Sequence, residues 1–250
     1  TNLKSHLYTL DIIEEKSEEI KKTNSMSSPI SFNNEITLKN VSFSFENEKP
    51  ILNDLSITIE KGQFIGIIGT SGVGKTTLLN IIAKLITPSK GNIYLDKTKI
   101  TKQNKHEYFN LFTYITQKPF IYEGTIQDNL LMFTEEDNHE DIDRILISMK
   151  LDKVINQFPN KLDTYIGADA GNLSAGQLQR ISIARAILNN PKILILDEAT
   201  NNLDIETEIE TLNYLKVFAK KRKITVISVS HHIEETKHLY DRIITLKEYS

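Results

Sequence analysis

Residues 64–77 read FIGIIGTSGVGKTT, a short apolar run that passes directly into a glycine-rich loop. A continuous apolar run of this length is typical of a strand that is buried on both faces of a sheet. The loop matches the pattern G-x-x-x-x-G-K-[ST], and apolar residues at helical spacing follow it as far as Ile86, before Pro88. Glycines let backbone N–H groups approach phosphate oxygens, and a helix start adds partial positive charge. The stretch therefore predicts a strand, a phosphate-binding loop and a helix, in that order.

The loop and the first helical turn are expected to hold the phosphates of a nucleotide. The Lys75 ammonium would bind the β- and γ-phosphates, and the Thr76 hydroxyl would ligate Mg²⁺. The alternative is a glycine-rich turn before an ordinary helix, and the strand and helix on either side argue against it. The nucleotide-binding residues expected in this stretch are Gly69, Thr70, Ser71, Gly72, Val73, Gly74, Lys75, Thr76 and Thr77.

A second buried strand, ILIL at residues 193–196, is followed by the acidic pair Asp197 and Glu198. Because ligands bind beyond the carboxyl ends of parallel strands, Asp197 is expected beside the phosphate-binding loop. We expect Asp197 to organise Mg²⁺, through water, and Glu198 to polarise an attacking water molecule. Taken alone, two acids after a strand would indicate only the start of a loop. The phosphate-binding loop is what favours the metal and catalytic roles.

The segment LSAGQ, residues 173–177, precedes a helix expected at residues 178–188. Ser174 and Gln177 have the spacing of a capping box, in which each side chain bonds the other residue's backbone N–H. A capped helix start with a small loop and a hydroxyl resembles a second anion site. The pattern alone favours an ordinary capped helix.

Strands and helices alternate along most of the chain, which indicates an α/β fold with a mainly parallel sheet. The early strands have no helix between them, and their apolar alternation, with a slip near Asn40, predicts an antiparallel side sheet. The expected strands are residues 36–45, 55–59, 64–68, 91–95, 111–116, 193–196, 224–229 and 242–246. The expected helices are residues 75–86, 178–188 and 204–220, together with a mainly helical region at 125–158.

The composition excludes several classes of protein. The chain has 250 residues, a formal net charge of −3 and no cysteine. It is not a disordered or collagen-like chain, and it has no disulfide framework, thiol catalysis or cysteine metal site. The near-neutral net charge shows no overall excess of basic residues, which nucleic-acid binding would need, so no nucleic-acid partner is expected. No apolar run reaches the roughly 18–20 residues that a membrane span needs.

Together the motifs resemble the nucleotide-binding domain of an ATP-binding cassette (ABC) transporter, over about residues 36–246. The resemblance implies a P-loop NTPase-like α/β fold, with a mainly parallel core sheet, an antiparallel side sheet and a helical subdomain at about residues 118–190. The family's motifs occur in the expected order: Walker A (69–76), Q-loop (Gln117), the LSGGQ signature (173–177), Walker B (193–198), D-loop (202–204) and switch histidine (His231).

The resemblance also implies a head-to-tail homodimer in which each ATP lies between the Walker A loop of one subunit and the signature of the other. Phe45 sits where the family has an aromatic residue, most often Tyr, that stacks on adenine; a core Phe on a strand is the alternative. Asp204 would face the other subunit and help form the shared site. The nucleotide-binding residues expected outside Walker A are Phe45, Ser174, Gly176, Gln177 and Asp204.

The same resemblance implies the catalytic roles. Glu198 would be the general base, and His231 rather than His232 would contact the γ-phosphate. Gln117 would approach Mg²⁺ and the attacking water. The expected catalytic residues are Glu198, His231, Gln117 and Lys75, and the expected metal ligands are Thr76, Gln117 and Asp197.

Two segments resemble the exporter branch of the family. Residues 120–130 resemble the stretch that receives the coupling helices of the membrane domain, and residues 8–19 resemble the segment that joins a membrane helix to the cassette. Because the chain begins at Thr1 without Met, we expect a cassette cut from a longer exporter on the cytoplasmic face of the membrane. Residues 1–28 would be its helix and linker, or a frayed tail, and residues 29–250 the nucleotide-binding domain.

The sequence also departs from the family's pattern. Ala175 replaces a signature glycine, and Ala168 replaces a glutamate that exporters carry before the signature. Asn201 and Asn202 replace the usual Ser-Ala of the D-loop. The chain stops at Ser250, before the final strand and helix that are common in exporters, which would be a truncation.

The expected function is ATP hydrolysis that drives bacterial export of a peptide or bacteriocin, a lipid or a drug, with Mg²⁺–ATP, a second copy and a transmembrane domain as partners. One alternative is an ABC ATPase that acts on DNA or ribosomes, which a coiled-coil insertion, a second cassette or a strongly basic region would have indicated. Another is an importer subunit, which the exporter-like segments oppose. The intact motif residues argue against a catalytically dead cassette.

Overall fold

The computed structural model describes residues 30–45, 49–134, 139–167, 171–230 and 232–247. The helix and linker predicted for residues 1–28 lie outside these ranges, as does position 168. Within the described residues, no helix combines the length and the apolar character that crossing a membrane requires.

The core is a five-stranded sheet in which every strand is parallel to its neighbours. The strand order is β11-β3-β10-β9-β6. The strands are β3 (Phe64–Ile68), β6 (Phe112–Ile115), β9 (Ile193–Asp197), β10 (Thr225–Val229) and β11 (Arg242–Thr245). Every residue of β9 and β10 is buried, as expected for strands covered on both faces. The carboxyl ends of β3, β10, β9 and β6 consequently lie side by side along one edge of the sheet.

A second, antiparallel sheet has the order β2-β1-β4-β5. Its strands are β1 (Glu35–Phe43), β2 (Leu52–Glu60), β4 (Lys90–Leu95) and β5 (Thr98–Lys99). The predicted slip near Asn40 is a register shift between Leu38 and Val41, where Asn40 has a φ of 49°. The Asn40 Nδ2 donates to Asp54 Oδ1 across the shift at 2.8 Å. The antiparallel side sheet is therefore confirmed.

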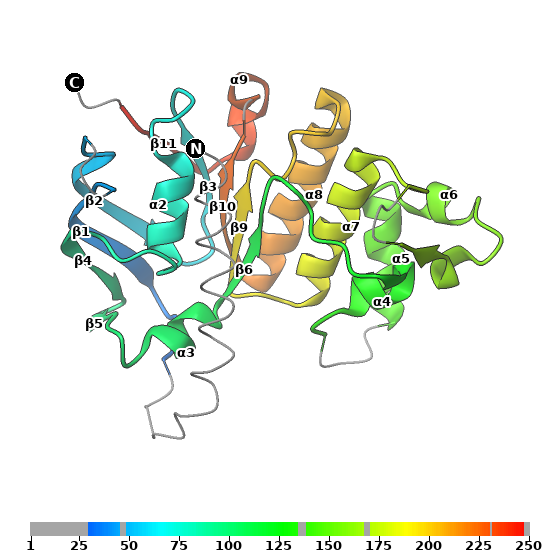
Figure 1. Ribbon diagram of the computed structural model, residues 1–250, viewed down its shortest axis with the longest axis horizontal. Helices are drawn as coiled ribbons and strands as arrows, with labels where there is room; N and C mark the ends of the chain where they lie inside the picture. The colour runs from blue at the N-terminus through cyan, green and yellow to red at the C-terminus, as the bar shows by residue number, and fades with distance from the viewer. Residues whose placement is uncertain (1–29, 46–48, 135–138, 168–170, 231, 248–250) are drawn as a thin grey trace.

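Helix α2 (Lys75–Ile82) packs in a core that it shares with both sheets, and Figure 1 shows it between them. It ends four residues before the predicted Ile86. Lys84 has a left-handed φ of 59°, which a continuing α-helix does not allow, so the chain turns before Pro88 stops it. The prediction extended the helix because the apolar Leu85 and Ile86 continue its spacing.

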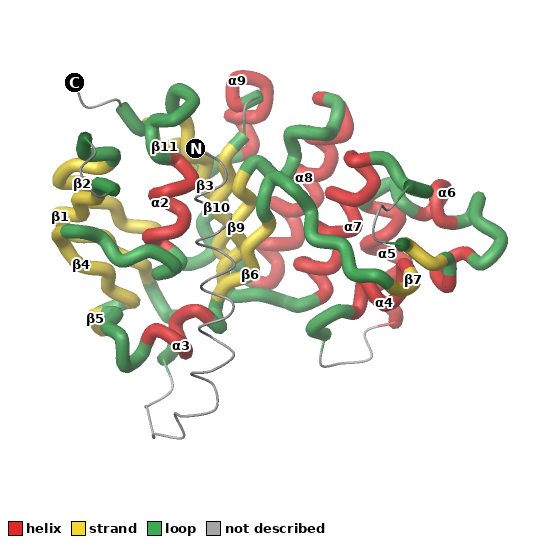
Figure 2. The backbone as a smooth tube through the Cα atoms, viewed as in Figure 1, coloured by secondary structure: helices red, strands yellow, loops and turns green. Residues whose placement is uncertain are grey.

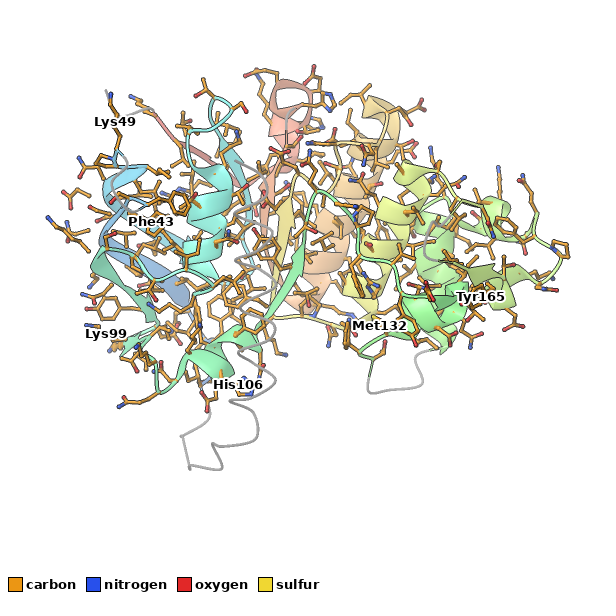
Figure 3. All side chains as sticks on the ribbon, viewed as in Figure 1. Phe43, Lys49, Lys99, His106, Met132 and Tyr165 are labelled. Carbon is orange, nitrogen blue, oxygen red and sulfur yellow. The ribbon has the colours of Figure 1, made fainter. Side chains whose placement is uncertain are left out.

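Most of the remaining helices gather on the other side of the core sheet, and Figure 2 shows them as a group to one side of its strands. The short helix of residues 105–109 is an exception, because its buried Tyr108 packs in the core that holds α2 and donates to the carbonyl of Ile82 at 2.7 Å. Figure 3 places Phe43 of the antiparallel sheet and Tyr165 of the helical part at opposite ends of the molecule's long axis. The helices are α3 (Lys105–Phe109), α4 (Ile126–Leu131), α5 (His139–Ser148), α6 (Asp152–Ile155), α7 (Ala175–Leu188), α8 (Ile205–Arg222) and α9 (Ile233–Thr236), with 3₁₀ turns η1 (Lys161–Asp163) and η2 (Lys237–Leu239). The α/β fold class is confirmed.

The sequence did not predict several short elements, among them β5, α3 and α9. Strands β7 (Gly124–Thr125) and β8 (Tyr165–Ile166) form a two-stranded antiparallel pair. A pair of two-residue strands is too short for apolar alternation to reveal it.

Candidate nucleotide site

The predicted nucleotide-binding residues 69–77 and the acidic pair Asp197 and Glu198 meet at the carboxyl edge of the core sheet. The loop after β3 and the end of β9 are joined there by a direct contact: Thr76 Oγ1 donates to Asp197 Oδ1 at 3.0 Å. Strand β10 separates β3 from β9 in the sheet, so the contact spans the width of one strand.

The glycine loop has a backbone shape that side chains would block. Gly74 precedes α2 with a φ of 101°, and a Cβ there would lie 2.4 Å from Cγ2 of Ile51. The loop therefore requires glycine at this position on two counts, conformation and space. A loop of this shape leaves the first backbone N–H groups of α2 free to bind an anion.

Lys75 places its charge against the same loop. Its side chain is 7% exposed, and Nζ donates to the carbonyl oxygens of Gly69 at 2.9 Å and Thr70 at 3.0 Å. Among the described residues, the hydrogen-bond acceptors that hold this ammonium over the loop are neutral carbonyls. An ammonium held in this way suits an anionic ligand, because burying a charge is costly without an opposite one.

Asp197 is the metal-binding candidate that the structure supports most directly. Besides Thr76, its carboxyl accepts a hydrogen bond from Tyr114 Oη at 3.0 Å, on Oδ2. Burial raises the pKa of Asp197, while the two hydroxyl donors and Lys75 lower it. A hydroxyl and a buried carboxyl oxygen are hard donors that suit Mg²⁺. The residues present therefore fit Mg²⁺.

Glu198 stands at the start of a tight turn. It adopts a left-handed φ of 54°, and its N–H donates to the carbonyl of Val229 in β10 at 3.1 Å. The N–H of Asn201 donates back to the Glu198 carbonyl at 3.2 Å, and Asn201 Nδ2 donates to Glu198 Oε2 at 3.0 Å. The unusual Asn201 thus contacts the carboxyl that the sequence predicts to be the general base.

The signature segment forms the capped start of α7. Ser174 Oγ accepts from Gln177 N at 3.2 Å, and Gln177 Oε1 accepts from Ser174 N at 2.8 Å, so the predicted capping box is confirmed. Ala175 is exposed, so its methyl group has room. Gly176 has none, because a Cβ there would lie 3.0 Å from the carbonyl oxygen of Asn202. The signature helix therefore packs closely on the D-loop of the same chain.

Three other predicted residues lie at the surface. Gln117 is exposed beyond the end of β6, and Phe45 is 42% exposed, with its ring edge against Phe43 at 5.0 Å between centroids. The carboxyl of Asp204 caps α8: it accepts from the N–H of Thr207 at 3.0 Å and from its hydroxyl at 2.8 Å. These positions leave Gln117 and Phe45 accessible to a ligand.

The predicted switch residue His231 lies outside the described residues. Its neighbour His232 is described, and its Nδ1 lies 2.7 Å from Oε2 of Glu208. The His232 side chain is thus already hydrogen-bonded to a carboxyl group of its own chain.

Three residues of the site were missed by sequence reasoning. Tyr114 donates to Asp197, and burial raises its pKa well above the usual range. Gln179, with no exposed surface, links the carbonyl of Gln117 at 3.1 Å to the N–H of Asn202 at 3.1 Å. Glu208, equally buried, binds His232. Gln179 lies just after the signature segment, whereas Tyr114 and Glu208 belong to no contiguous motif. The contacts of all three became visible only when the fold brought distant segments together.

The chain is similar to proteins of a known family. The family model "ABC transporter" matches residues 52–201. The chain is 38% identical over 233 residues to the lactococcin-G-processing and transport ATP-binding protein LagD of Lactococcus lactis, covering 93% of the chain and 33% of LagD. It is 34% identical to the mesentericin-Y105 transport/processing protein MesD of Leuconostoc mesenteroides, covering 92% of the chain and 31% of MesD. It is 35% identical to the ATP-dependent permease MDL1 of Candida albicans, covering 86% of the chain and 32% of MDL1.

The fold is also similar to that of a solved ABC exporter. A bacterial Atm1-family ABC exporter with ATP bound matches with a TM-score of 0.79 and 27% identity, over 88% of the chain and 39% of the exporter chain. The chain spans about a third of the length of the curated relatives described above.

Proposed function

The chain belongs to the ABC transporter family of ATP-hydrolysing transporter ATPases, as a domain of the exporter type, and we propose that it drives bacterial export across the cytoplasmic membrane by closing on ATP as a head-to-tail homodimer. One observation carries the proposal: the contact between Thr76 and Asp197 joins the phosphate-binding loop to the acidic strand end, beside Lys75 and Glu198. That is the arrangement needed to bind a triphosphate and activate water next to it. The exporter relatives, two of them bacterial, support the transport role.

Each group of residues has a part in the proposed reaction. The loop N–H groups and Lys75 would bind the phosphates, and Phe45 would stack on the adenine. When Mg²⁺ is bound, Thr76, Asp197 and Gln117 would hold it, and it would supply charge neutralisation on the phosphates. Glu198 would accept a proton from the attacking water.

A second copy would complete the site. Both helix starts, at residues 73–76 and at residues 174–177, offer N–H groups and positive dipole ends to one triphosphate from opposite sides. Gly176, Ser174, Gln177 and Asp204 would belong to the copy facing the nucleotide. ATP would then stabilise the dimer by contacting both halves, and hydrolysis would release it. The cargo would be set by a membrane domain that accompanies the cassette, with peptides, lipids and drugs as the candidate classes.

The protein-concentration dependence of ATP turnover tests the shared site. Turnover per volume should rise more steeply than linearly with protein concentration, because two copies build each site. Lys75→Ala protein serves as the control for background hydrolysis. Strict proportionality down to low concentration would contradict the dimer proposal, and absence of turnover at all concentrations would contradict the ATPase role.

A further inference from the structure

A fully buried carboxyl, that of Glu208 in the first turns of α8, has no place among the residues assigned to the nucleotide. Its Oε1 accepts from Thr200 Oγ1 at 2.6 Å and from Ser230 Oγ at 2.8 Å, and its Oε2 accepts from His232 Nδ1 at 2.7 Å. Burying a carboxyl is costly unless hydrogen bonds compensate it. The three donors explain how the protein tolerates this group, and their origin indicates what the group does.

The donors come from the ends of two adjacent strands. Thr200 lies in the turn after β9, while Ser230 and His232 follow β10, which pairs with β9 along its whole length. Ser230 Oγ also accepts from the N–H of His232 at 3.0 Å, so the chain after β10 is folded onto the same carboxyl. Glu208 therefore ties α8 to the carboxyl ends of both strands.

The turn that Thr200 anchors is the one that begins with Glu198. The left-handed φ of Glu198 is unfavourable for a residue with a Cβ, and such a conformation persists only where the surroundings hold it. Thr200 is 1% exposed and points its hydroxyl at Glu208. Its hydrogen bond fixes the middle of the turn from the side of α8.

We propose that Glu208 is a positioning residue for Glu198: through Thr200 it holds the 198–201 turn, and thereby the carboxyl of Glu198, where the attacking water is bound. This inference rests on the proposed ATPase function. His232 has the supporting role of fixing the second oxygen of Glu208. A carboxyl held in this way needs no rearrangement when ATP binds, and a misplacement of about 1 Å can cost on the order of 100-fold in rate.

The sharpest test exchanges Thr200 for residues that differ in one group. Thr200→Val keeps the shape and removes the hydroxyl, whereas Thr200→Ser keeps the hydroxyl. We expect Thr200→Val to lower the kcat of ATP hydrolysis about tenfold with the KM for ATP within about twofold, and Thr200→Ser to retain most of kcat. Thr225→Val is the matched control: Thr225 is buried at the opposite end of β10, where its Oγ1 accepts from Gly62 N at 2.8 Å. It should lower the melting temperature and leave kcat unchanged.

A second pair of variants keeps the test decisive if Thr200→Val folds poorly. His232→Leu removes the donor from a half-exposed side chain, and His232→Asn places an amide N–H close to the position of Nδ1. We expect His232→Leu to lower kcat several-fold and His232→Asn to recover most of it. The inference is overturned if Thr200→Val or His232→Leu turns over at the wild-type rate, or if Thr225→Val lowers kcat as much as Thr200→Val. Failure of the ATPase function itself would look different, because the wild-type chain would then show no turnover.

Discussion

The phosphate-binding loop at residues 69–76 and the 198–201 turn lie at strand ends of the same sheet, but different kinds of contact hold them. The loop is shaped mainly by its own residues: Lys75 binds carbonyls five and six residues before it, and Gly74 has the positive φ and the open space that the loop needs beside Ile51. The turn is held by the buried side chain of Glu208 in α8, and Asn202, the residue after the turn, is held by the buried Gln179 of α7. A structure that depends on neighbouring residues can be recognised as a contiguous motif in the sequence. A structure that depends on residues distant in the sequence shows no such motif.

The largest effect is expected from the turn. Glu198→Gln removes the proposed base with almost no change in shape, so kcat should fall at least about 100-fold while ATP binding persists and the ATP-bound dimer accumulates. Single-turnover hydrolysis and size-exclusion chromatography with ATP would measure the two effects. Glu60→Gln, at the exposed end of β2, is the matched control and should behave as wild type. Unchanged turnover in Glu198→Gln would remove Glu198 from the chemistry and leave the turn a structural feature.

The second-largest effect is expected in the phosphate-binding loop, where a substitution should weaken ATP binding rather than slow hydrolysis. Lys75→Ala removes the buried ammonium, and hydrogen bonds to charged groups contribute about 1.5–3 kcal/mol. The affinity for ATP should therefore fall on the order of 10- to 100-fold. Titration calorimetry measures it, with the exposed Lys102→Ala as the control. Wild-type affinity in Lys75→Ala would contradict the assignment of this loop to the phosphates.

The sequence predicted the features that neighbouring residues encode and missed those that depend on residues distant in the chain. The loop at 69–76, the strand that ends at Asp197 and the capping box of Ser174 and Gln177 were all predicted, because each is encoded by neighbouring residues. The bulge at Asn40 was predicted for the same reason: a one-residue slip shifts the apolar alternation to the other face of a strand.

The contacts of Tyr114 and Gln179 could not be predicted. Each depends on which strands become neighbours and which helix covers them, and those choices are made by packing of the whole domain. Gln179 is a buried residue of α7, and a polar side chain on a buried face gives no apolar periodic signal. The end of α2 was missed for a related reason, since spacing alone does not show where the backbone turns to left-handed φ.

A smaller effect should show that the loop depends on backbone shape. Gly74→Ala puts a Cβ on a residue with a φ of 101° and 2.4 Å from Ile51. The left-handed conformation alone costs about 1–2 kcal/mol, and the clash adds to it. Gly167→Ala is the control, because a Cβ at Gly167 meets no atom of the described residues within 4 Å. Equal stability of the two variants in urea unfolding would show that the loop rearranges freely, contrary to the contrast drawn above.

The smallest effect should show that the chain just after the turn depends on a side chain that is distant in the sequence. Gln179→Met keeps the length of the side chain but leaves the carbonyl of Gln117 and the N–H of Asn202 without their shared partner. Each unmet buried group costs about 1–3 kcal/mol unless water reaches it, and both loops lie at the surface, so the loss of stability should be at the low end. The informative readout is kcat, which should fall a few-fold, with ATP affinity unchanged, because the loops of Gln117 and Asn202 lose their common anchor while the phosphate-binding loop keeps its own. If Gln179→Met weakened ATP binding instead, the two regions would be mechanically joined, and the independence of the loop from the turn would fail.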